Sequence, residues 1–192
     1  MEARAPMTGR FVLLDRDGTI NQEVDHLDRA DQVALIPGAA AAMRRLSSAG
    51  LGLVVLTNQA NVGRGLLPAD RLEEIHARLT RLLSDEGVRL DGLYVCPHAP
   101  EDGCDCRKPR AGLALRAATD HGFRPDDSFV VGDHVADMGL GRAIGAVTIL
   151  VRTGHGEDEL KTGAGAQADH VVADLLEAAG VVLDSVVSGV RP

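Results

Sequence analysis

The stretch FVLLDRDGTIN, residues 11–21, runs four apolar residues directly into two aspartates that one residue separates. Ionised carboxylates are costly to bury unless a cation holds them, so Asp15 and Asp17 cannot serve a hydrophobic core. Gly18 follows at once and allows the backbone to turn sharply. The pattern predicts a buried strand, followed either by a solvated loop or by a site that holds a cation and does chemistry.

Apolar runs of strand length alternate with segments of helical period along the rest of the chain. Strands that are apolar throughout and separated by helices indicate a parallel sheet covered on both faces. We therefore predict an α/β fold with a doubly wound, Rossmann-like, mostly parallel sheet. The expected strands are residues 11–15, 51–57, 92–96, 128–133, 146–151 and 169–172.

Helices are expected between these strands, over residues 39–50, from Pro68 onward, over 111–121 and 136–145, and from 174 to 180 or beyond. In the helix from Pro68, apolar residues recur at i, i+3, i+7 and i+10, which predicts one buried stripe. No repeat, low-complexity tract or linker divides the chain, so residues 1–192 are expected to form a single domain with residues 1–9 flexible. The stripe comprises Leu72, Ile75, Leu79 and Leu82.

Composition excludes several classes of partner. The 192 residues are 45% hydrophobic and carry a formal net charge of −8, whereas a protein that binds nucleic acid or anionic membrane usually shows a basic footprint. The start of the chain lacks an apolar run that could act as a secretory signal, and no stretch approaches the length of a membrane span. We expect a cytoplasmic monomer whose partner is a small molecule.

Polar residues cluster directly after four of the predicted strands. Asp15 and Asp17 follow the first, residues 57–59 the second, residues 107–108 the third and residues 132–133 the fourth. Ligands of such sheets bind beyond the carboxyl ends of the strands. Unrelated solvated loops would rarely share one edge, so the clusters predict a single functional site.

The residue types at that edge suit phosphoryl transfer. The carboxylates of Asp15, Asp17 and Asp133 would repel one another unless a hard cation lay among them, and oxygen ligands favour Mg²⁺. Lys108 supplies a fixed positive charge, and the Thr57 hydroxyl can donate to a phosphate oxygen. An aspartate can attack phosphorus to form an aspartyl-phosphate, while its neighbour exchanges protons with the leaving alcohol and the water.

All three cysteines of the chain lie in one short segment, which also contains a histidine. Three thiolates and an imidazole complete a tetrahedral zinc site and leave no position for a catalytic water, so a structural role is expected. The alternative is three ordinary cytosolic cysteines near a surface histidine. The predicted zinc loop spans residues 96–106, and its ligands would be Cys96, His98, Cys104 and Cys106.

The motifs DRDGT, TNQ, RKP and VGD, the last followed by Asp137, resemble in order the four motifs of the haloacid dehalogenase (HAD) superfamily of phosphatases. The resemblance implies an HAD-like fold in which Asp15 is the nucleophile and Asp17 the general acid and base. It places the transferring phosphoryl group at Thr57 and Lys108. It also implies Mg²⁺ ligation by Asp15, by the backbone carbonyl of Asp17 and by Asp133, with Asp137 in a supporting role.

The arrangement CPH…CDCRKP resembles one subfamily, the D-glycero-D-manno-heptose-1,7-bisphosphate 7-phosphatases and the related histidinol-phosphatases. A Gly-Arg-Gly after the second motif is more similar to the heptose enzymes. It makes Arg64 a candidate contact for the non-reacting phosphate, with Arg107 as a second. Asn58 can either bind sugar hydroxyls or hold its turn. His134 stands where the heptose enzymes often carry lysine, which leaves the anomer preference open.

The sequence thus predicts a Mg²⁺-dependent phosphatase with a structural zinc ion. The expected substrate is a small phosphorylated metabolite, a heptose bisphosphate cleaved at C7 in the synthesis of nucleotide-activated heptose. Histidinol phosphate is an alternative substrate. A phospho-accepting signalling domain is an alternative of another class, although such a domain has no use for an acid and base at Asp17. The remaining histidines, at positions 26, 76, 121, 155 and 170, show no partner pattern and are expected at the surface.

Overall fold

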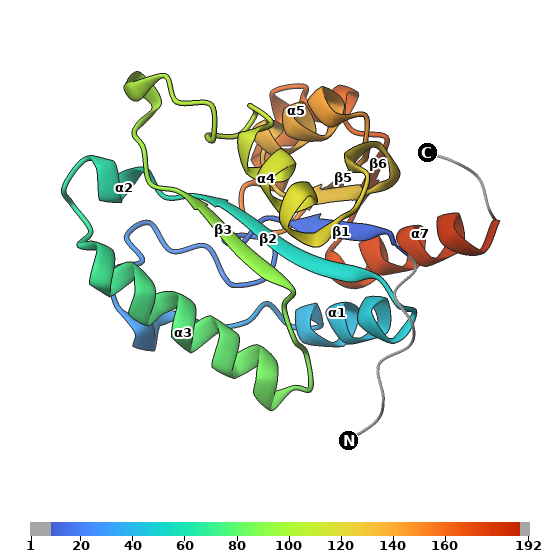
Figure 1. The fold of residues 1–192 in the computed structure, drawn as a ribbon, viewed down its shortest axis with the longest axis horizontal. Helices are drawn as coiled ribbons and strands as arrows, with labels where there is room; N and C mark the ends of the chain where they lie inside the picture. The colour runs from blue at the N-terminus through green and yellow to red at the C-terminus, as the bar shows by residue number, and fades with distance from the viewer. Residues whose placement is uncertain (1–8, 189–192) are drawn as a thin grey trace.

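The computed structural model describes residues 9–188. Within these residues, six strands form one parallel sheet in the order β3-β2-β1-β4-β5-β6, which confirms the predicted doubly wound fold (Figure 1). The order reverses between β1 and β4, and such a reversal opens a crevice at the carboxyl ends of the strands. The strands are β1 (Phe11–Leu14), β2 (Gly52–Asn58), β3 (Gly92–Cys96), β4 (Phe129–Gly132), β5 (Val147–Val151) and β6 (His170–Val172).

Helices cover both faces of the sheet, as the apolar strands predict (Figure 1). One core joins alternate strand residues such as Leu14 and Val55 to one set of helices, and the other joins Leu13 and Val54 to the second set. The side chains of successive strand residues therefore pack into opposite cores. The first face carries α1 (Ala39–Ser48), α3 (Ala69–Asp85) and α7 (Leu175–Ser188), and the second carries α4 (Gly112–His121) and α5 (Val135–Ile144).

The predicted stripe of α3 is right except at its last position. Leu72, Ile75 and Leu79 are buried, but the fourth buried residue is Leu83, and Leu82 is half-buried. Leu83 follows Leu72 by eleven residues, which is slightly more than three whole turns, whereas ten residues leave Leu82 rotated away from the stripe. The sequence reading also missed two short helices, α2 (Ala60–Gly63) and α6 (Gly156–Lys161), which are too short for a periodic signal.

In the part of the chain that the structure describes, four 3₁₀ segments connect the larger elements, at Ala30–Gln32, Pro100–Asp102, Pro125–Asp127 and Ala164–Gln167. The second of these lies in the loop after β3, which projects beyond the edge of the sheet (Figure 1). The predicted flexible segment 1–9 lies, apart from Gly9, outside the described residues. The single domain over residues 1–192 stays a prediction.

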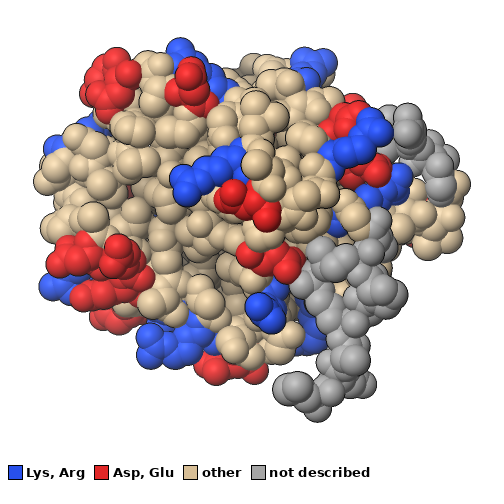
Figure 2. Space-filling model, viewed as in Figure 1, with Lys and Arg blue, Asp and Glu red and all other residues tan. Residues whose placement is uncertain are grey.

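On the face seen in Figure 2, acidic and basic side chains are interspersed, and neither kind forms one large patch. That pattern agrees with the absence of a basic footprint in the composition. Among residues 9–188, no helix has both the length and the apolar character needed to cross a membrane.

Candidate active site

Asp15 follows the last residue of β1 and faces the crevice between β1 and β4. Its backbone N–H donates to the Val131 carbonyl, 2.9 Å away, which fixes the turn out of the strand. Lys108 Nζ lies 2.7 Å from Asp15 Oδ1. Burial raises the pKa of Asp15 to about 6, although the Lys108 ammonium opposes the change. The lysine therefore keeps a half-buried carboxylate available in its ionised form at neutral pH.

Lys108 is held by three acceptors at one distance. Its Nζ lies 2.7 Å from Asp15 Oδ1, from Asp137 Oδ1 and from the Leu56 carbonyl. Burial alone would lower the pKa of Lys108, but the charges of Asp137 and Asp15 outweigh it and raise that pKa. The ammonium uses its three protons on these acceptors, so it is a fixed charge rather than a mobile one.

Three carboxylates converge beside this lysine. Asp15, Asp133 and Asp137 each offer an oxygen, and these oxygens lie within 4.8 Å of one another. Burial and the charge of Asp15 raise the pKa of Asp133 to about 8. A bound cation would favour the ionised form of all three carboxylates, which together with the ammonium sum to a charge of −2, and one divalent cation would neutralise that charge. The all-oxygen donor set and this charge fit Mg²⁺.

Two glycines hold Asp133 in place by their lack of side chains. Gly18 and Gly154 have φ values of +69° and +57°. A Cβ built on Gly18 would lie 2.0 Å from Asp133 Oδ2, and one built on Gly154 would lie 2.2 Å from the same atom. The backbone N–H of His155 donates to that oxygen at 2.8 Å. The loops after β1 and β5 therefore both pack against the Asp133 carboxylate. Sequence reasoning did not predict this contact of Gly154.

Asp17 lies outside the three-carboxylate cluster. Its carboxylate accepts hydrogen bonds from the guanidinium of Arg16 and from two side-chain amides. Arg16 Nη2 lies 2.6 Å from Asp17 Oδ2, and Arg16 Nε lies 3.1 and 3.0 Å from the two oxygens. Asn21 Nδ2 and Gln59 Nε2 add bonds of 2.9 and 3.0 Å. Burial raises the pKa of Asp17, but the Arg16 charge and these bonds outweigh it and lower the pKa overall.

Thr57 occupies the end of β2 with its side chain buried. Its Oγ1 accepts from Gln59 Nε2 at 2.8 Å, which leaves the hydroxyl proton available for an acceptor in the crevice. Gln59 thus joins Thr57 to Asp17 through a single amide group.

A cavity of about 600 Å³ opens over these residues. The four predicted substrate contacts all lie on its walls: Asn58, Arg64, Arg107 and His134. The structure also places on the walls several residues to which sequence reasoning gave no role, among them Arg16, Glu23, Gln59 and His155. The cavity has the size of a typical small-molecule site.

The four predicted contacts differ in how firmly the protein holds them. Asn58 bonds both backbone groups of Lys108: its Nδ2 donates to the carbonyl at 3.2 Å, and its Oδ1 accepts from the N–H at 3.1 Å. His134 caps α5 by accepting from Ala136 and lies 3.0 Å from Glu159. Arg64 is exposed. The geometry favours a turn-holding role for Asn58 over the sugar contact.

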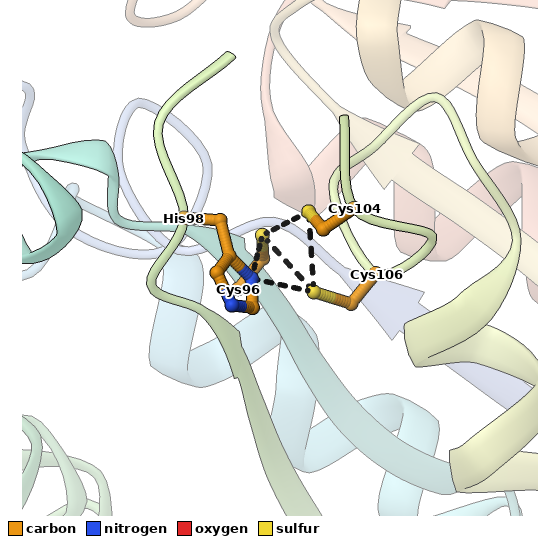
Figure 3. Close-up of side chains that lie close together, drawn as sticks. All are labelled: Cys96, His98, Cys104 and Cys106. Carbon is orange, nitrogen blue, oxygen red and sulfur yellow. Dashed lines mark hydrogen bonds between the residues drawn. The ribbon is translucent and has the colours of Figure 1, made fainter. Parts of the chain in front are cut away.

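Figure 3 shows the four predicted zinc ligands turned toward one common point. Cys96 ends β3 and His98 follows it, while Cys104 and Cys106 come from the loop before α4. The three sulfurs lie 3.3 to 3.6 Å apart, and His98 Nδ1 lies 3.7 Å from Cys96 Sγ and 3.2 Å from Cys106 Sγ. Zinc–sulfur bonds of about 2.3 Å place the sulfurs of a tetrahedral site about 3.8 Å apart. The cluster is compatible with zinc.

The surface prediction for the remaining histidines is right for three and wrong for two. His26, His155 and His170 are exposed, although His155 also lines the cavity. His76 and His121 are half-buried with partners: His76 Nε2 lies 2.9 Å from Arg16 Nη1, and His121 Nε2 lies 3.1 Å from the Tyr94 hydroxyl. Both contacts join residues more than 25 positions apart, so local sequence carries no signal for them.

Comparison with known proteins finds relatives along nearly the whole chain. Residues 105–178 match a family described as HAD-hydrolase-like. The chain is 38% identical over 155 residues to the D-glycero-beta-D-manno-heptose-1,7-bisphosphate 7-phosphatase of Pseudomonas putida, a match that covers 80% of this chain and 89% of that one. The enzyme of the same name from Bordetella bronchiseptica is 34% identical over 175 residues, covering 91% and 98%.

Solved structures agree with these sequence matches. The crystal structure of D,D-heptose 1,7-bisphosphate phosphatase from B. bronchiseptica, complexed with magnesium and phosphate, is similar to this chain with a TM-score of 0.86 and 33% identity. That match covers 92% of this chain and 99% of the crystallised one. The chain therefore belongs to the haloacid dehalogenase superfamily of phosphatases, in the subfamily that contains these heptose-bisphosphate phosphatases.

Proposed function

We propose that this phosphomonoester hydrolase removes the C7 phosphate of D-glycero-D-manno-heptose 1,7-bisphosphate through an aspartyl-phosphate on Asp15, with Mg²⁺, in the synthesis of nucleotide-activated heptose. The observation that carries the proposal is the contact of Lys108 with both Asp15 and Asp137 on the floor of the cavity, beside Asp133. The names of the relatives support the substrate. The cytoplasmic location and the monomeric state stay predictions.

Asp15 is the group best placed to attack phosphorus. Its carboxylate lies at the carboxyl end of β1, ionised and held by Lys108. Mg²⁺ bound by the carboxylates of Asp15 and Asp133 and by the Asp17 carbonyl would supply the positive charge that lets two anions approach. The fixed positive charge of Lys108 would attract the phosphoryl oxygens, and the Thr57 hydroxyl would donate to one of them. Because both groups are already in place, they need little reorganisation as charge develops.

Asp17 serves as the proton carrier in this proposal. Its ionised form, which Arg16 favours, suits the later step in which a water must lose a proton before it attacks the aspartyl-phosphate. In the earlier step the leaving alcohol must gain a proton. A phosphate dianion that enters the cavity raises the pKa of Asp17 by like-charge repulsion and so favours the protonated form at that moment.

The walls of the cavity would select the rest of the substrate. Arg64 and Arg107 are the cationic groups that suit a second phosphate, and Arg107 is anchored to the zinc loop through the His98 carbonyl at 3.4 Å. His134 lies on the same cavity. The zinc ion is proposed as structural: it would fix the loop that leads directly into Arg107 and Lys108.

Histidinol phosphate remains the second candidate because Glu23 and Asp25 also line the cavity. These carboxylates would suit the cationic amine of histidinol, whereas a bisphosphate needs the arginines. The test is kcat/KM for both anomers of heptose 1,7-bisphosphate and for histidinol phosphate, since that ratio reports discrimination. The proposal expects a bisphosphate to rank first, and the β anomer named in the relatives is the first to measure. A higher value for histidinol phosphate would replace the proposed substrate.

Arg64→Ala should lower kcat/KM for the bisphosphate by about tenfold to a hundredfold, the loss expected for one charged hydrogen bond. The same variant should leave kcat/KM for a monophosphate such as p-nitrophenyl phosphate within about twofold of wild type. Arg116→Ala, on the exposed face of α4, is the matched control. Equal losses for both esters would mean that Arg64 does not contact a second phosphate.

Gly154→Ala should weaken Mg²⁺ binding by about tenfold or more, because the added methyl group occupies the position of Asp133 Oδ2. Titration calorimetry with Mg²⁺ measures the effect directly, without turnover. Gly163→Ala is a suitable control, since its φ is also positive and a Cβ there meets no atom within 4 Å. Unchanged Mg²⁺ affinity in Gly154→Ala would show that the close approach does not position Asp133 for the ion.

A further inference from the structure

Arg16 is a buried cation beside the proposed proton carrier. Its side chain is 1% exposed, and the guanidinium directs Nε and Nη2 at the Asp17 carboxylate. A buried charge is stable only when its hydrogen-bonding groups are satisfied. The third nitrogen, Nη1, points away from Asp17 and toward α3, where it lies 2.9 Å from His76 Nε2.

The chemistry of this contact assigns the protonation of the histidine. A guanidinium has only donors, so the nitrogen that faces it must be an acceptor. His76 Nε2 is therefore bare, and Nδ1 carries the proton. Burial, together with the charge of Arg16, lowers the pKa of His76 to about 4, so the ring stays neutral at the pH values at which phosphatases are assayed.

The backbone around His76 is fixed by the core. Ile75 and Leu79, on the same helix, are 1% and 0% exposed and pack in the core that includes β1. His76 is thus carried by a helix that cannot easily rotate. An imidazole ring on a rigid helix can fix the orientation of a guanidinium. The guanidinium can in turn fix the orientation of the carboxylate to which it donates.

We propose that His76 is a positioning residue for the proposed reaction: by accepting a hydrogen bond from Arg16, it sets the orientation in which Arg16 holds the Asp17 carboxylate toward the leaving group. This inference rests on the proposed function of Asp17 as acid and base. Helix α3 contributes no side chain to the cavity lining. By this inference it nevertheless helps to determine how efficiently a proton reaches the leaving group.

The test compares two esters within one preparation of the Mg²⁺-loaded enzyme. Heptose 1,7-bisphosphate has an alkoxide leaving group that needs a proton, whereas p-nitrophenyl phosphate has a phenolate that leaves without one. His76→Ala should lower kcat/KM for the alkyl ester on the order of tenfold and leave that for the aryl ester within about twofold. The ratio of the two values does not depend on the fraction of folded protein. A purely structural role would lower both alike.

His76→Gln provides the rescue, because its amide oxygen can accept from Nη1 as the ring nitrogen does. This variant should recover the alkyl-to-aryl ratio to within about threefold of wild type. His170→Ala, at an exposed position on β6, is the matched control and should leave the ratio unchanged. Histidine-selective ¹⁵N NMR should show Nε2 of His76 without a proton. An unchanged ratio in His76→Ala, or a proton on Nε2, would overturn the inference.

Asp17→Asn separates this inference from the proposed function. If Asp17 delivers the proton, Asp17→Asn lowers kcat/KM for the alkyl ester by about a hundredfold to ten-thousandfold and that for the aryl ester far less. Failure of that result contradicts the role of Asp17 itself. When Asp17→Asn shows the selective loss and His76→Ala does not, only the positioning role of His76 is wrong.

Discussion

Asp15→Asn should lower kcat/KM by about ten-thousandfold or more, the scale on which enzymes lose activity when the nucleophile is removed. The amide keeps the size of the carboxylate and can still accept from Lys108, whose Nζ lies 2.7 Å from Asp15 Oδ1. It cannot form an acyl phosphate at the required rate, because a neutral amide is a poor nucleophile. Steady-state release of phosphate from heptose 1,7-bisphosphate measures the effect.

Two controls make the loss in Asp15→Asn interpretable. Asp120→Asn removes a carboxylate from the exposed side of α4 and should leave kcat/KM at the wild-type value. Binding of inorganic phosphate at saturating Mg²⁺, measured by calorimetry, should persist in Asp15→Asn, because Lys108 and Thr57 remain. Activity near that of wild type in Asp15→Asn would refute the nucleophile assignment.

Cys104→Ser should release the zinc ion and lower the free energy of unfolding by at least about 3 kcal/mol, since structural zinc binding contributes more than this to folding. The loss follows from the geometry: the two remaining sulfurs, 3.3 Å apart, would be left without the metal that holds the loop together. Elemental analysis gives zinc per chain, and chemical denaturation gives the free energy of unfolding. The fraction that stays folded should keep some activity.

Asp105→Asn is the matched control for Cys104→Ser, because Asp105 is an exposed neighbour in the same loop. Its variant should keep one zinc ion per chain and wild-type stability. Absence of zinc from native protein purified without chelator would end the zinc assignment, whatever the stability of Cys104→Ser.

The sequence was sufficient to predict the strands of the sheet and the residues that lie at its carboxyl edge. Buried parallel strands need long apolar runs, and each run found by inspection is a strand in the structure. Asp15, Thr57, Lys108 and Asp133 come together because parallel strands end at one edge, so their positions at or after the ends of predicted strands already indicated their proximity.

The residues that the sequence did not reveal act through contacts between distant parts of the chain. Gly154 approaches Asp133 and Gly18 from a loop more than 130 positions after Gly18, and His76 meets Arg16 across 60 positions. A glycine in a loop, or a histidine on a helix, has many ordinary explanations. Only packing decides that these two face a carboxylate and a guanidinium.

Asn58 shows a different limit of sequence reasoning. An amide at the end of a strand can bind a ligand or hold a turn, and both uses require the same residue type. The structure commits the side chain to both backbone groups of Lys108, at 3.2 and 3.1 Å. The position of the Lys108 backbone therefore depends on Asn58.

The most direct test of the account is to trap the phosphoryl group on Asp15. In Asp17→Asn, p-nitrophenyl phosphate can still transfer its phosphoryl group without an acid, but the step that needs a base to activate water is slowed. Rapid mixing with Mg²⁺ and this ester, followed by an acid quench and peptide mass spectrometry, should show a burst of about one nitrophenolate per chain and one phosphoryl group on Asp15. A phosphoryl group on another residue, or turnover without a burst or any covalent adduct, would contradict the account.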